Sequence, residues 1–250
     1  MPPPRLTVEE ASVAYIRAMR NALSPDTAGV CRICRTFIDP TYRRCWPCKE
    51  QPNNLDVVVP ITYSEHLGQM HTALRSYKDG RSEEERRYAM VRLTAILWRF
   101  LDAHQTCVRR AAGVREFDLV TTVPSSTPEG DEARRGLRQI VEWCTPIANR
   151  YERVLTATGD VPPGRDYAPT RYKAGWRIDG VRVLLIDDTW TRGGHAQSAA
   201  HALREAGASK VGLVVIGRHL RRDWEVTDGV TSGELFDELP PFDWTTCSVE

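Results

Sequence analysis

The sequence predicts an α/β domain with a mostly parallel sheet, preceded by a small module that carries four cysteines. An apolar run at 183–186 leads into two acidic residues, a glycine-containing turn and a helical pattern, and a second apolar run follows at 211–216. Short apolar runs bounded by turn residues are typical of buried parallel strands, and the helical pattern between them supplies the crossover. Two C-x-x-C pairs precede the first strand pattern. They predict a metal-stabilised module.

Composition bounds the class of protein. The chain has 250 residues, 41% of them hydrophobic, which is enough for one sizeable core and a small appendage. A net charge of +1 gives no overall field that would attract nucleic acid or membrane. No apolar run has the length of a membrane span, and residues 1–4 lack the apolar region of a signal peptide. We therefore expect a cytoplasmic protein without membrane contact or structural disulfides.

The N-terminal residues predict a helix. Thr7 and Glu10 have the spacing of a capping box, and the pattern stops before Pro25. A packing or interaction helix is the simplest interpretation. We divide the chain into an N-terminal helix at 1–27, a four-cysteine zinc module at 28–52, the α/β domain at 53–220 and a tail of little periodicity at 221–250.

Four cysteines form two C-x-x-C pairs with ten residues between them, and they are Cys31, Cys34, Cys45 and Cys48. Each pair forms a knuckle whose thiolates point the same way, and four thiolates make a closed tetrahedral zinc site. Such a site is structural, because it leaves no open position for catalysis. A redox pair or unrelated core cysteines are the alternatives. The basic residues around the knuckles suit a protein or single-stranded DNA partner, although Tyr42 and Trp46 are the only clear aromatic platform for bases.

The middle of the chain predicts a strand at 56–63, a short helix at 66–77 and a long helix from Ser82 to about Arg110. Ser82 and Glu85 form a second capping box pattern. Residues at helical spacing along the long helix are expected to face inward, and they are Tyr88, Val91, Ala95, Trp98 and Leu101. His71 and His104 are interpreted as surface or packing residues, and no role is assigned to Cys107, Cys144 and Cys247.

A third strand is predicted at 117–123, followed by a polar loop, a helix at about 133–150 and a weak strand at 151–156. The stretch 159–175 is rich in glycine, proline and charge and predicts a mobile loop. Because it carries Arg171 and Lys173, it could act as a lid over a polyanionic substrate. A surface excursion without function is the alternative.

The chemistry is concentrated after the run 183–186. Asp187 and Asp188 would emerge at the carboxyl end of a parallel strand, where ligands of open α/β sheets bind. Two adjacent carboxylates could accept hydrogen bonds from a ribose diol or bind hydrated Mg²⁺. The turn 191–195 would present backbone N–H groups at a helix N-terminus, which favours a phosphate. Together these features predict a site for a ribose 5-phosphate, with an ordinary buried strand and acidic loop as the alternative.

This stretch resembles the phosphoribosyl pyrophosphate (PRPP) signature of type I phosphoribosyltransferases. Asp187 and Asp188 match its acidic pair, while Thr191, Gly193 and Gly194 fit its phosphate loop, and Arg192 and His195 stand where the family usually has threonine or serine. The resemblance implies a Rossmann-like type I phosphoribosyltransferase fold and PRPP binding with Mg²⁺. It also implies a pyrophosphate-binding role for the loop after 117–123. The residues concerned there are Ser125, Ser126, Arg134 and Arg135.

Further segments resemble the ComF group of this family, whose members carry a four-cysteine zinc module ahead of the transferase domain. The segments 75–80 (R-S-Y-K-D-G) and 135–139 (R-G-L-R-Q) resemble their L-K-Y-x-G and R-G-F-N-Q stretches, and the resemblance spans about 31–218. It implies phosphoribosyl transfer from PRPP to a nitrogen nucleophile with release of pyrophosphate. The alternative is a non-catalytic sensor of PRPP or a nucleoside monophosphate, with a partner bound through the zinc module. The sequence leaves the oligomeric state open.

Overall fold

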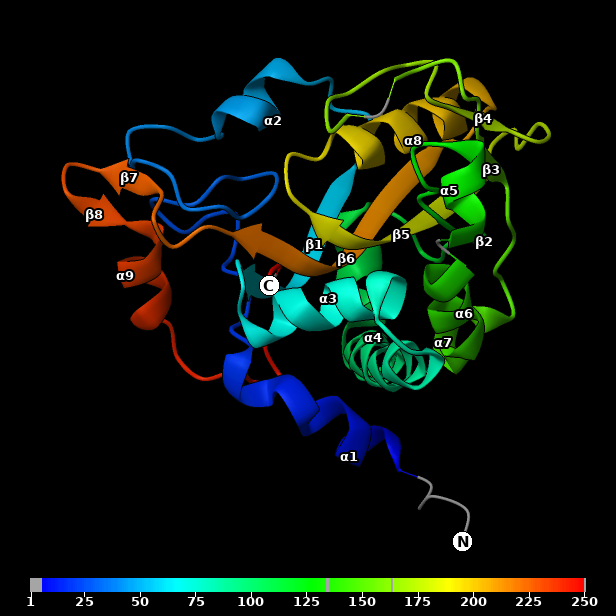
Figure 1. Cartoon of the computed structure of the whole chain (residues 1–250). Helices are drawn as coiled ribbons and strands as arrows, with labels where there is room; N and C mark the ends of the chain where they lie inside the picture. The colour runs from blue at the N-terminus through cyan, green and yellow to red at the C-terminus, as the bar shows by residue number, and fades with distance from the viewer. Residues whose placement is uncertain (1–5, 134, 163, 250) are drawn as a thin grey trace, which may run out of the picture.

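The protein is described by a computed structural model that covers residues 6–133, 135–162 and 164–249. Its centre is a four-stranded parallel sheet in the order β1-β6-β5-β2 (Figure 1). The apolar runs that predicted strands therefore lie side by side in one sheet, as expected for an α/β fold. The strands are β1 (Val57–Glu65), β2 (Leu119–Thr122), β5 (Arg182–Trp190) and β6 (Lys210–Leu220).

The strands of this sheet have unequal lengths. β5 pairs with β6 as far as Trp190 opposite Arg218, whereas β2 pairs with β5 only as far as Thr122 opposite Ile186. Beyond Ile186, β5 therefore has a strand neighbour on one side only. This gap at the carboxyl end of the sheet is where the chain leaves β2 for the short helix α5 (Pro128–Ala133).

Helices cover one face of the sheet (Figure 1). Side chains of Leu97, Leu101 and Ile140 pack in one apolar cluster with Leu184 and Ile186 of β5. The long predicted helix is confirmed, and the Ser82 hydroxyl accepts from the Glu85 amide at its start. The helices are α3 (Gln69–Asp79), α4 (Glu83–Ala111), α6 (Arg135–Trp143) and α7 (Thr145–Ala148). The inward prediction for Tyr88 is wrong, because its side chain is 53% exposed and its ring lies beside Arg92.

The opposite face is covered by α8 (Gly194–Glu205), by the hairpin of β3 (Leu155–Ala157) and β4 (Tyr172–Ala174), and by the four-cysteine segment. The segment 159–175, predicted to be a loop, therefore ends in a strand. The four-cysteine segment includes the short helix α2 (Trp46–Glu50) and lies beside α8 (Figure 1). Three of its cysteines share an apolar cluster with Val58 and Leu213 of the sheet, so packing is continuous between them.

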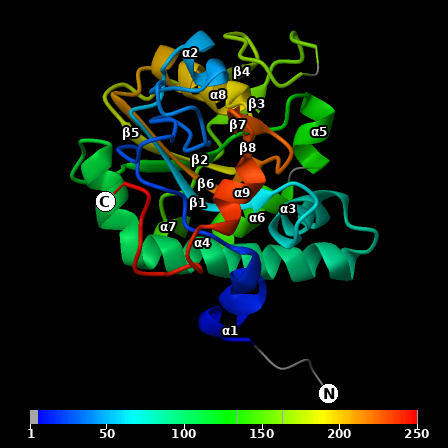
Figure 2. The ribbon, with the colours of Figure 1, turned by 90° about the vertical axis from the view of Figure 1, so that its left-hand side faces the viewer.

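Both ends of the chain pack on this body. The Thr7–Glu10 capping box is present, but α1 (Val8–Ser12) is shorter than predicted and continues as a 3₁₀ helix, η1 (Val13–Ala18). The tail forms β7 (Glu225–Thr227), β8 (Val230–Thr231) and α9 (Ser232–Asp237), and its last residues run along α4 (Figure 2). This contact includes a bond between His104 Nε2 and the Trp244 carbonyl at 2.8 Å.

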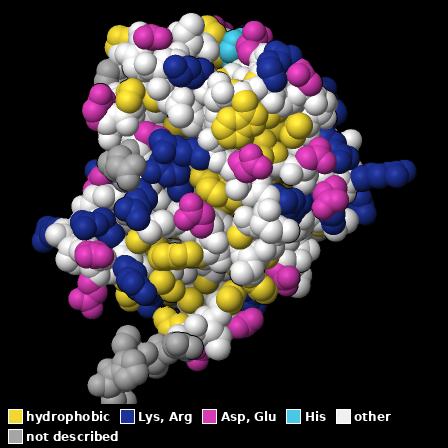
Figure 3. All heavy atoms as spheres, turned by 90° about the vertical axis from the view of Figure 1, so that its right-hand side faces the viewer, with side chains coloured by type: hydrophobic (Ala, Val, Ile, Leu, Met, Phe, Trp, Pro, Cys, Tyr) yellow, Lys and Arg dark blue, Asp and Glu magenta, His cyan; other side chains and the backbone are white. Residues whose placement is uncertain are grey.

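Charged side chains of both signs lie on the surface. Acidic and basic side chains are interspersed on the face in Figure 3. Among the described residues, no helix combines the length and the apolar character that a membrane crossing requires.

Candidate functional site

A cavity of about 570 Å³ lies at the carboxyl ends of the sheet strands. Segments that are far apart in the sequence meet there: the start of α3, the end of β5, the turn into α8 and the end of β6. Most of the residues predicted to bind PRPP line it, and these are Ser125, Asp187, Asp188, Thr191, Arg192, Gly193, Gly194 and His195.

The two aspartates lie within β5 rather than beyond its end. Because successive side chains of a strand point to opposite faces, Asp188 lies on the α3 side and Asp187 on the α8 side. Both reach the cavity, yet Asp187 is 6% and Asp188 2% exposed. The Asp188 amide donates to Asp187 Oδ1 at 2.9 Å, which fixes the first carboxylate against the backbone.

Asp188 is held by two residues of α3. The Tyr77 hydroxyl donates to Asp188 Oδ2 at 2.6 Å, and the Lys78 ammonium forms an ion pair with the same oxygen. Lys78 therefore offsets the cost of burying the Asp188 carboxylate. The contacts with Tyr77 and Lys78 use part of the hydrogen-bonding capacity of that carboxylate inside the protein.

Gly136 adds a third segment to this arrangement. A Cβ at Gly136 would stand 2.8 Å from the ring atom Cδ2 of Tyr77, so only glycine allows α6 to approach Tyr77 this closely. The segment 75–80 thus reaches Asp188 through Tyr77 and Lys78, and the segment 135–139 packs on Tyr77. Their separation in the sequence hides this contact, and no local pattern could have revealed it.

The turn after β5 has the geometry of an anion site. Gly193 begins α8 with a φ of 86°, in the left-handed region that favours glycine, and no side chain caps the helix. The Trp190 ring lies directly against Gly193 and would collide with a Cβ there. The N-terminus of a 12-residue helix therefore faces the cavity with its positive dipole end.

A second segment, 164–168, packs on this turn. The His195 ring donates from Nε2 to the Gly164 carbonyl at 2.6 Å, and Arg192 forms an ion pair with Asp166 at 3.3 Å. A Cβ at Gly194 would lie 2.6 Å from the Tyr167 amide nitrogen. The two residues that depart from the phosphoribosyltransferase signature, Arg192 and His195, thus hold the covering segment in place.

The predicted lid residues lie elsewhere. Arg171 is 3% exposed, and its guanidinium donates to the Asp166 carbonyl at 3.2 Å, so it supports the covering segment from within. Lys173 lies on β4 and lines a different cavity, beside Trp176 and Glu205.

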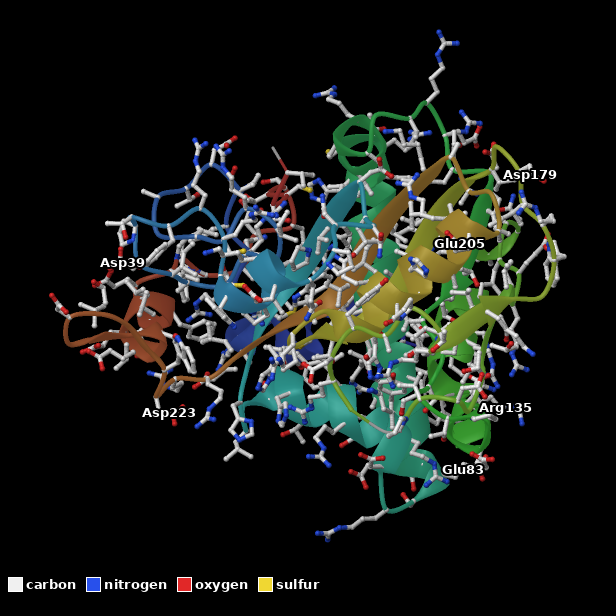
Figure 4. The ribbon with its side chains drawn as sticks, turned by 90° about the horizontal axis from the view of Figure 1, so that it is seen from above. Asp39, Glu83, Arg135, Asp179, Glu205 and Asp223 are labelled. Atoms are coloured by element: carbon white, nitrogen blue, oxygen red, sulfur yellow. The ribbon has the colours of Figure 1, made fainter. Side chains whose placement is uncertain are left out.

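The loop after β2 contributes less than the sequence predicted. Ser125 lines the cavity and its amide donates to Asp131 Oδ1 at 3.3 Å. Ser126 is half-buried and is not part of the cavity wall. Arg135 is exposed at the start of α6, at the periphery of the molecule (Figure 4). Arg134 lies outside the described residues.

Three histidines that sequence reasoning missed also line the cavity: His66, His71 and His219. His71 was interpreted as a surface or packing residue. Burial, together with the positive charge of His71 and Arg218, lowers the pKa of His219 to about 4. Burial and the charge of His66 also lower the pKa of His71. No spacing rule could find this cluster, because its members come from three separate elements.

The four predicted zinc ligands converge. Their sulfur atoms lie within 4.8 Å of one another, and Cys34 Sγ is 3.6 Å from Cys45 Sγ. Tetrahedral zinc with bonds of about 2.3 Å places its sulfurs roughly 3.8 Å apart, so the cluster fits this ion. All four are free cysteines.

The cysteine cluster is joined to the cavity. Arg218 is buried and donates from Nε to the Cys34 carbonyl at 2.9 Å, and its other nitrogens reach Cys34 Sγ at 3.5 Å and the Trp190 carbonyl at 3.1 Å. The side-chain amide of Gln51 donates from Nε2 to the Arg192 carbonyl at 3.1 Å. The cysteine segment therefore supports both ends of the turn that follows Asp188.

Comparisons with known proteins give a limited likeness. No family model and no curated protein matches the chain. Among solved structures, the crystal structure of purine phosphoribosyltransferase from Pyrococcus horikoshii Ot3 is similar to part of it, with 11% sequence identity and a TM-score of 0.31. The match covers 53% of this chain and 93% of that one. A likeness of this size leaves the function to be inferred from the site itself.

Proposed function

We propose that the cavity binds PRPP and that the protein transfers its phosphoribosyl group to a nitrogen nucleophile, such as a heterocyclic base, with release of pyrophosphate. The observation that carries this proposal is the presence of two carboxylates and an uncapped helix N-terminus in one cavity. A ribose 5-phosphate needs acceptors for its diol and donors for its phosphate, and the end of β5 supplies both within a few residues.

Each residue then has a role. Asp187 and Asp188 accept hydrogen bonds from the ribose hydroxyls and lie near the positive charge that develops at the anomeric carbon. The amides of 191–195 bind the 5-phosphate. Arg75 and Arg165, which also line the cavity, balance the charge of the departing pyrophosphate together with Ser125.

The carboxylates also suit Mg²⁺, since oxygen is the ligand this ion prefers. Bound with PRPP, Mg²⁺ would neutralise pyrophosphate oxygens. Ser126 and Arg135 would join the site only if the loop between β2 and α6 moved toward the cavity. Arg171 would take part in a lid by holding the segment 164–168 from beneath, and Lys173 would do so only if β4 moved toward this cavity.

The finer assignment is to a ComF-like group with a structural zinc module. It is supported by the four converging cysteines, by the contact of the segment 75–80 with Asp188, and by the packing of Gly136 against Tyr77. In this proposal, zinc holds the cysteine segment against the turn and takes no part in the reaction. A protein or single-stranded DNA partner would bind on the outer side of this segment.

One observation favours the alternative function, a sensor that binds PRPP or a nucleoside monophosphate without turnover. Arg192 and His195 hold the segment 164–168 on the phosphate turn, so a ligand must compete with that segment. A site that opens on binding suits a conformational signal. The two functions use the same cavity and differ in turnover.

The experiment is pyrophosphate release from PRPP with Mg²⁺ and a panel of bases, combined with calorimetric binding of PRPP. We expect pyrophosphate release to fall to background in the double variant Asp187→Asn with Asp188→Asn. The matched control is Asp228→Asn, an exposed aspartate between β7 and β8. Binding without release would favour the sensor, whereas release that survives the double substitution would remove both assignments from this cavity.

A further inference from the structure

Three histidines converge at the edge of the cavity from separate elements. His66 follows β1, His71 lies in the first turn of α3, and His219 lies near the end of β6, where it is next to the last residue of the strand. Their ring centroids are 5.0, 5.3 and 5.4 Å apart. One nitrogen from each ring lies within 4.8 Å of the other two.

Packing alone does not account for this convergence. Within the part of the chain that the structure describes, the ring nitrogens of His66 and His219 make no hydrogen bond to protein. The His71 ring accepts at Nδ1 from the Leu67 amide at 3.2 Å. Three basic rings that face one another, beside Arg75 and Arg165 in the cavity wall, repel one another once protonated.

The backbone between two of these histidines is strained. Leu67 has a φ of 63°, in the left-handed region that non-glycine residues rarely adopt, and its side chain is exposed. Such strained conformations are found preferentially at binding sites. Here it turns the chain so that His66 and His71, five residues apart, face the same point.

We propose that His66, His71 and His219 bind a divalent transition metal ion of the zinc type. Imidazole nitrogen is a preferred ligand of zinc, whereas Mg²⁺ prefers oxygen, so this site differs from a magnesium site at the aspartates. Zinc–nitrogen bonds of about 2.0–2.1 Å require the nitrogens to be roughly 3.4 Å apart. The three nitrogens lie within 4.8 Å of one another, and rotation of the exposed His66 ring is the movement that would bring them closer.

The position of the cluster decides what the metal would do. Three protein ligands leave the fourth position of a tetrahedral ion open, in contrast to the closed four-cysteine site. That position faces the cavity that also contains Arg75 and Arg165. It would take water or an oxygen of an anionic ligand such as phosphate. The metal site itself does not depend on the proposed phosphoribosyl transfer.

The test is cobalt(II) and zinc(II) binding by the full chain, after removal of metal. We expect two metal equivalents in the native chain. One gives the thiolate-to-metal charge-transfer absorption of the cysteine cluster, and the other adds no thiolate absorption. In His66→Ala and in His71→Ala the second equivalent is lost while the thiolate absorption is retained. His66 is exposed, so its removal leaves the fold intact, which circular dichroism checks.

The matched control is His201→Ala, a histidine of α8 outside the cluster, which keeps both equivalents. Inorganic phosphate then tests the open position, and it shifts the cobalt spectrum of the native chain but not that of His66→Ala. A native chain with one equivalent would overturn the proposal. So would a second equivalent that persists in both histidine variants or that carries thiolate absorption, since His104, Cys107 and Cys247 form another metal-like cluster.

Discussion

At the scale of single residues, Arg192 and His195 change what the turn after β5 does. Their side chains bind Asp166 and the Gly164 carbonyl, and they thereby hold the segment 164–168 against the turn. The backbone of the turn keeps the glycine geometry of an anion site. Under the proposed function, the segment 164–168 is therefore an internal competitor of the phosphate.

This competition predicts the effect of Arg192→Thr combined with His195→Ser. An exposed ion pair contributes about 0–1 kcal/mol and a hydrogen bond about 1 kcal/mol. Their loss weakens the attachment of the segment 164–168 to the turn by a free energy that corresponds to roughly tenfold in affinity. We expect PRPP to bind about tenfold more tightly by calorimetry. Arg177→Thr, which removes a local pair with Asp179, is the control. Equal binding by the double variant would mean that the segment 164–168 does not compete with PRPP, and weaker binding would mean that these side chains contact the ligand.

Gly193 predicts a second effect at this scale. In Gly193→Ala the new Cβ meets both a left-handed backbone and the Trp190 ring, whereas in Gly180→Ala it meets the same backbone region and open space. The difference between the two variants isolates the collision, which should cost about 1–3 kcal/mol of unfolding free energy. Urea unfolding measures it. Equal losses in the two variants would show that the ring moves aside.

At the scale of elements, β6 links the four-cysteine cluster to the histidine cluster. Arg218 joins Cys34 to the Trp190 carbonyl at the end of β5, and the next residue, His219, belongs to the histidine cluster. The charge of the neighbouring cysteine cluster raises the pKa of Arg218 against the effect of burial, so the guanidinium is charged. The end of β6 therefore connects the cysteine segment to the turn through the side chain of Arg218.

Arg218→Gln tests this link. Removing one partner of a buried charged arrangement costs about 3–5 kcal/mol, so we expect a large loss of stability and faster release of zinc to a chelator. Arg221→Gln removes an exposed arginine whose partner, Asp223, is two residues away, and it should change little. Thermal unfolding and zinc-release kinetics report the two effects. An unchanged rate of zinc release in Arg218→Gln would mean that Arg218 of β6 does not stabilise the cysteine cluster.

At the scale of the whole molecule, the four-cysteine segment belongs to the core. Cys31, Cys34 and Cys48 pack in one cluster with Leu155 and with Leu213 of the sheet. The tail is joined in the same way, because Phe242 and Cys247 pack in the cluster beneath α4. The four-cysteine segment and the C-terminal tail, which the sequence suggested were separate from the α/β domain, therefore share its apolar core.

This packing predicts how zinc removal acts. In a His66→Ala background, where only the cysteine cluster binds zinc, a strong chelator should lower the unfolding temperature of the entire chain in one transition. Calorimetry distinguishes this from a separate low-temperature transition of the segment alone. The chelator should have no further effect in Cys31→Ser. Two resolved transitions would mean that residues 28–52 fold as an independent module.

Several features could be predicted from local sequence because local chemistry is sufficient for them. The apolar runs of β1, β5 and β6 predicted a parallel sheet, the cysteine spacing predicted a converging cluster, and the acidic pair with Gly193 predicted a cavity at the end of β5. Each depends on strand burial, knuckle geometry or glycine conformation within a few residues.

The tertiary structure decided how those features are used. Tyr77 and Lys78 reach Asp188, the segment 164–168 covers the turn, and three histidines from three elements meet at the cavity edge. These contacts join residues tens of positions apart, and their partners follow from how helices pack on the sheet. The sequence by itself thus determined two acids near a strand end and a glycine turn that begins a helix. Packing determined which groups contact them, because long-range contacts depend on the assembled core.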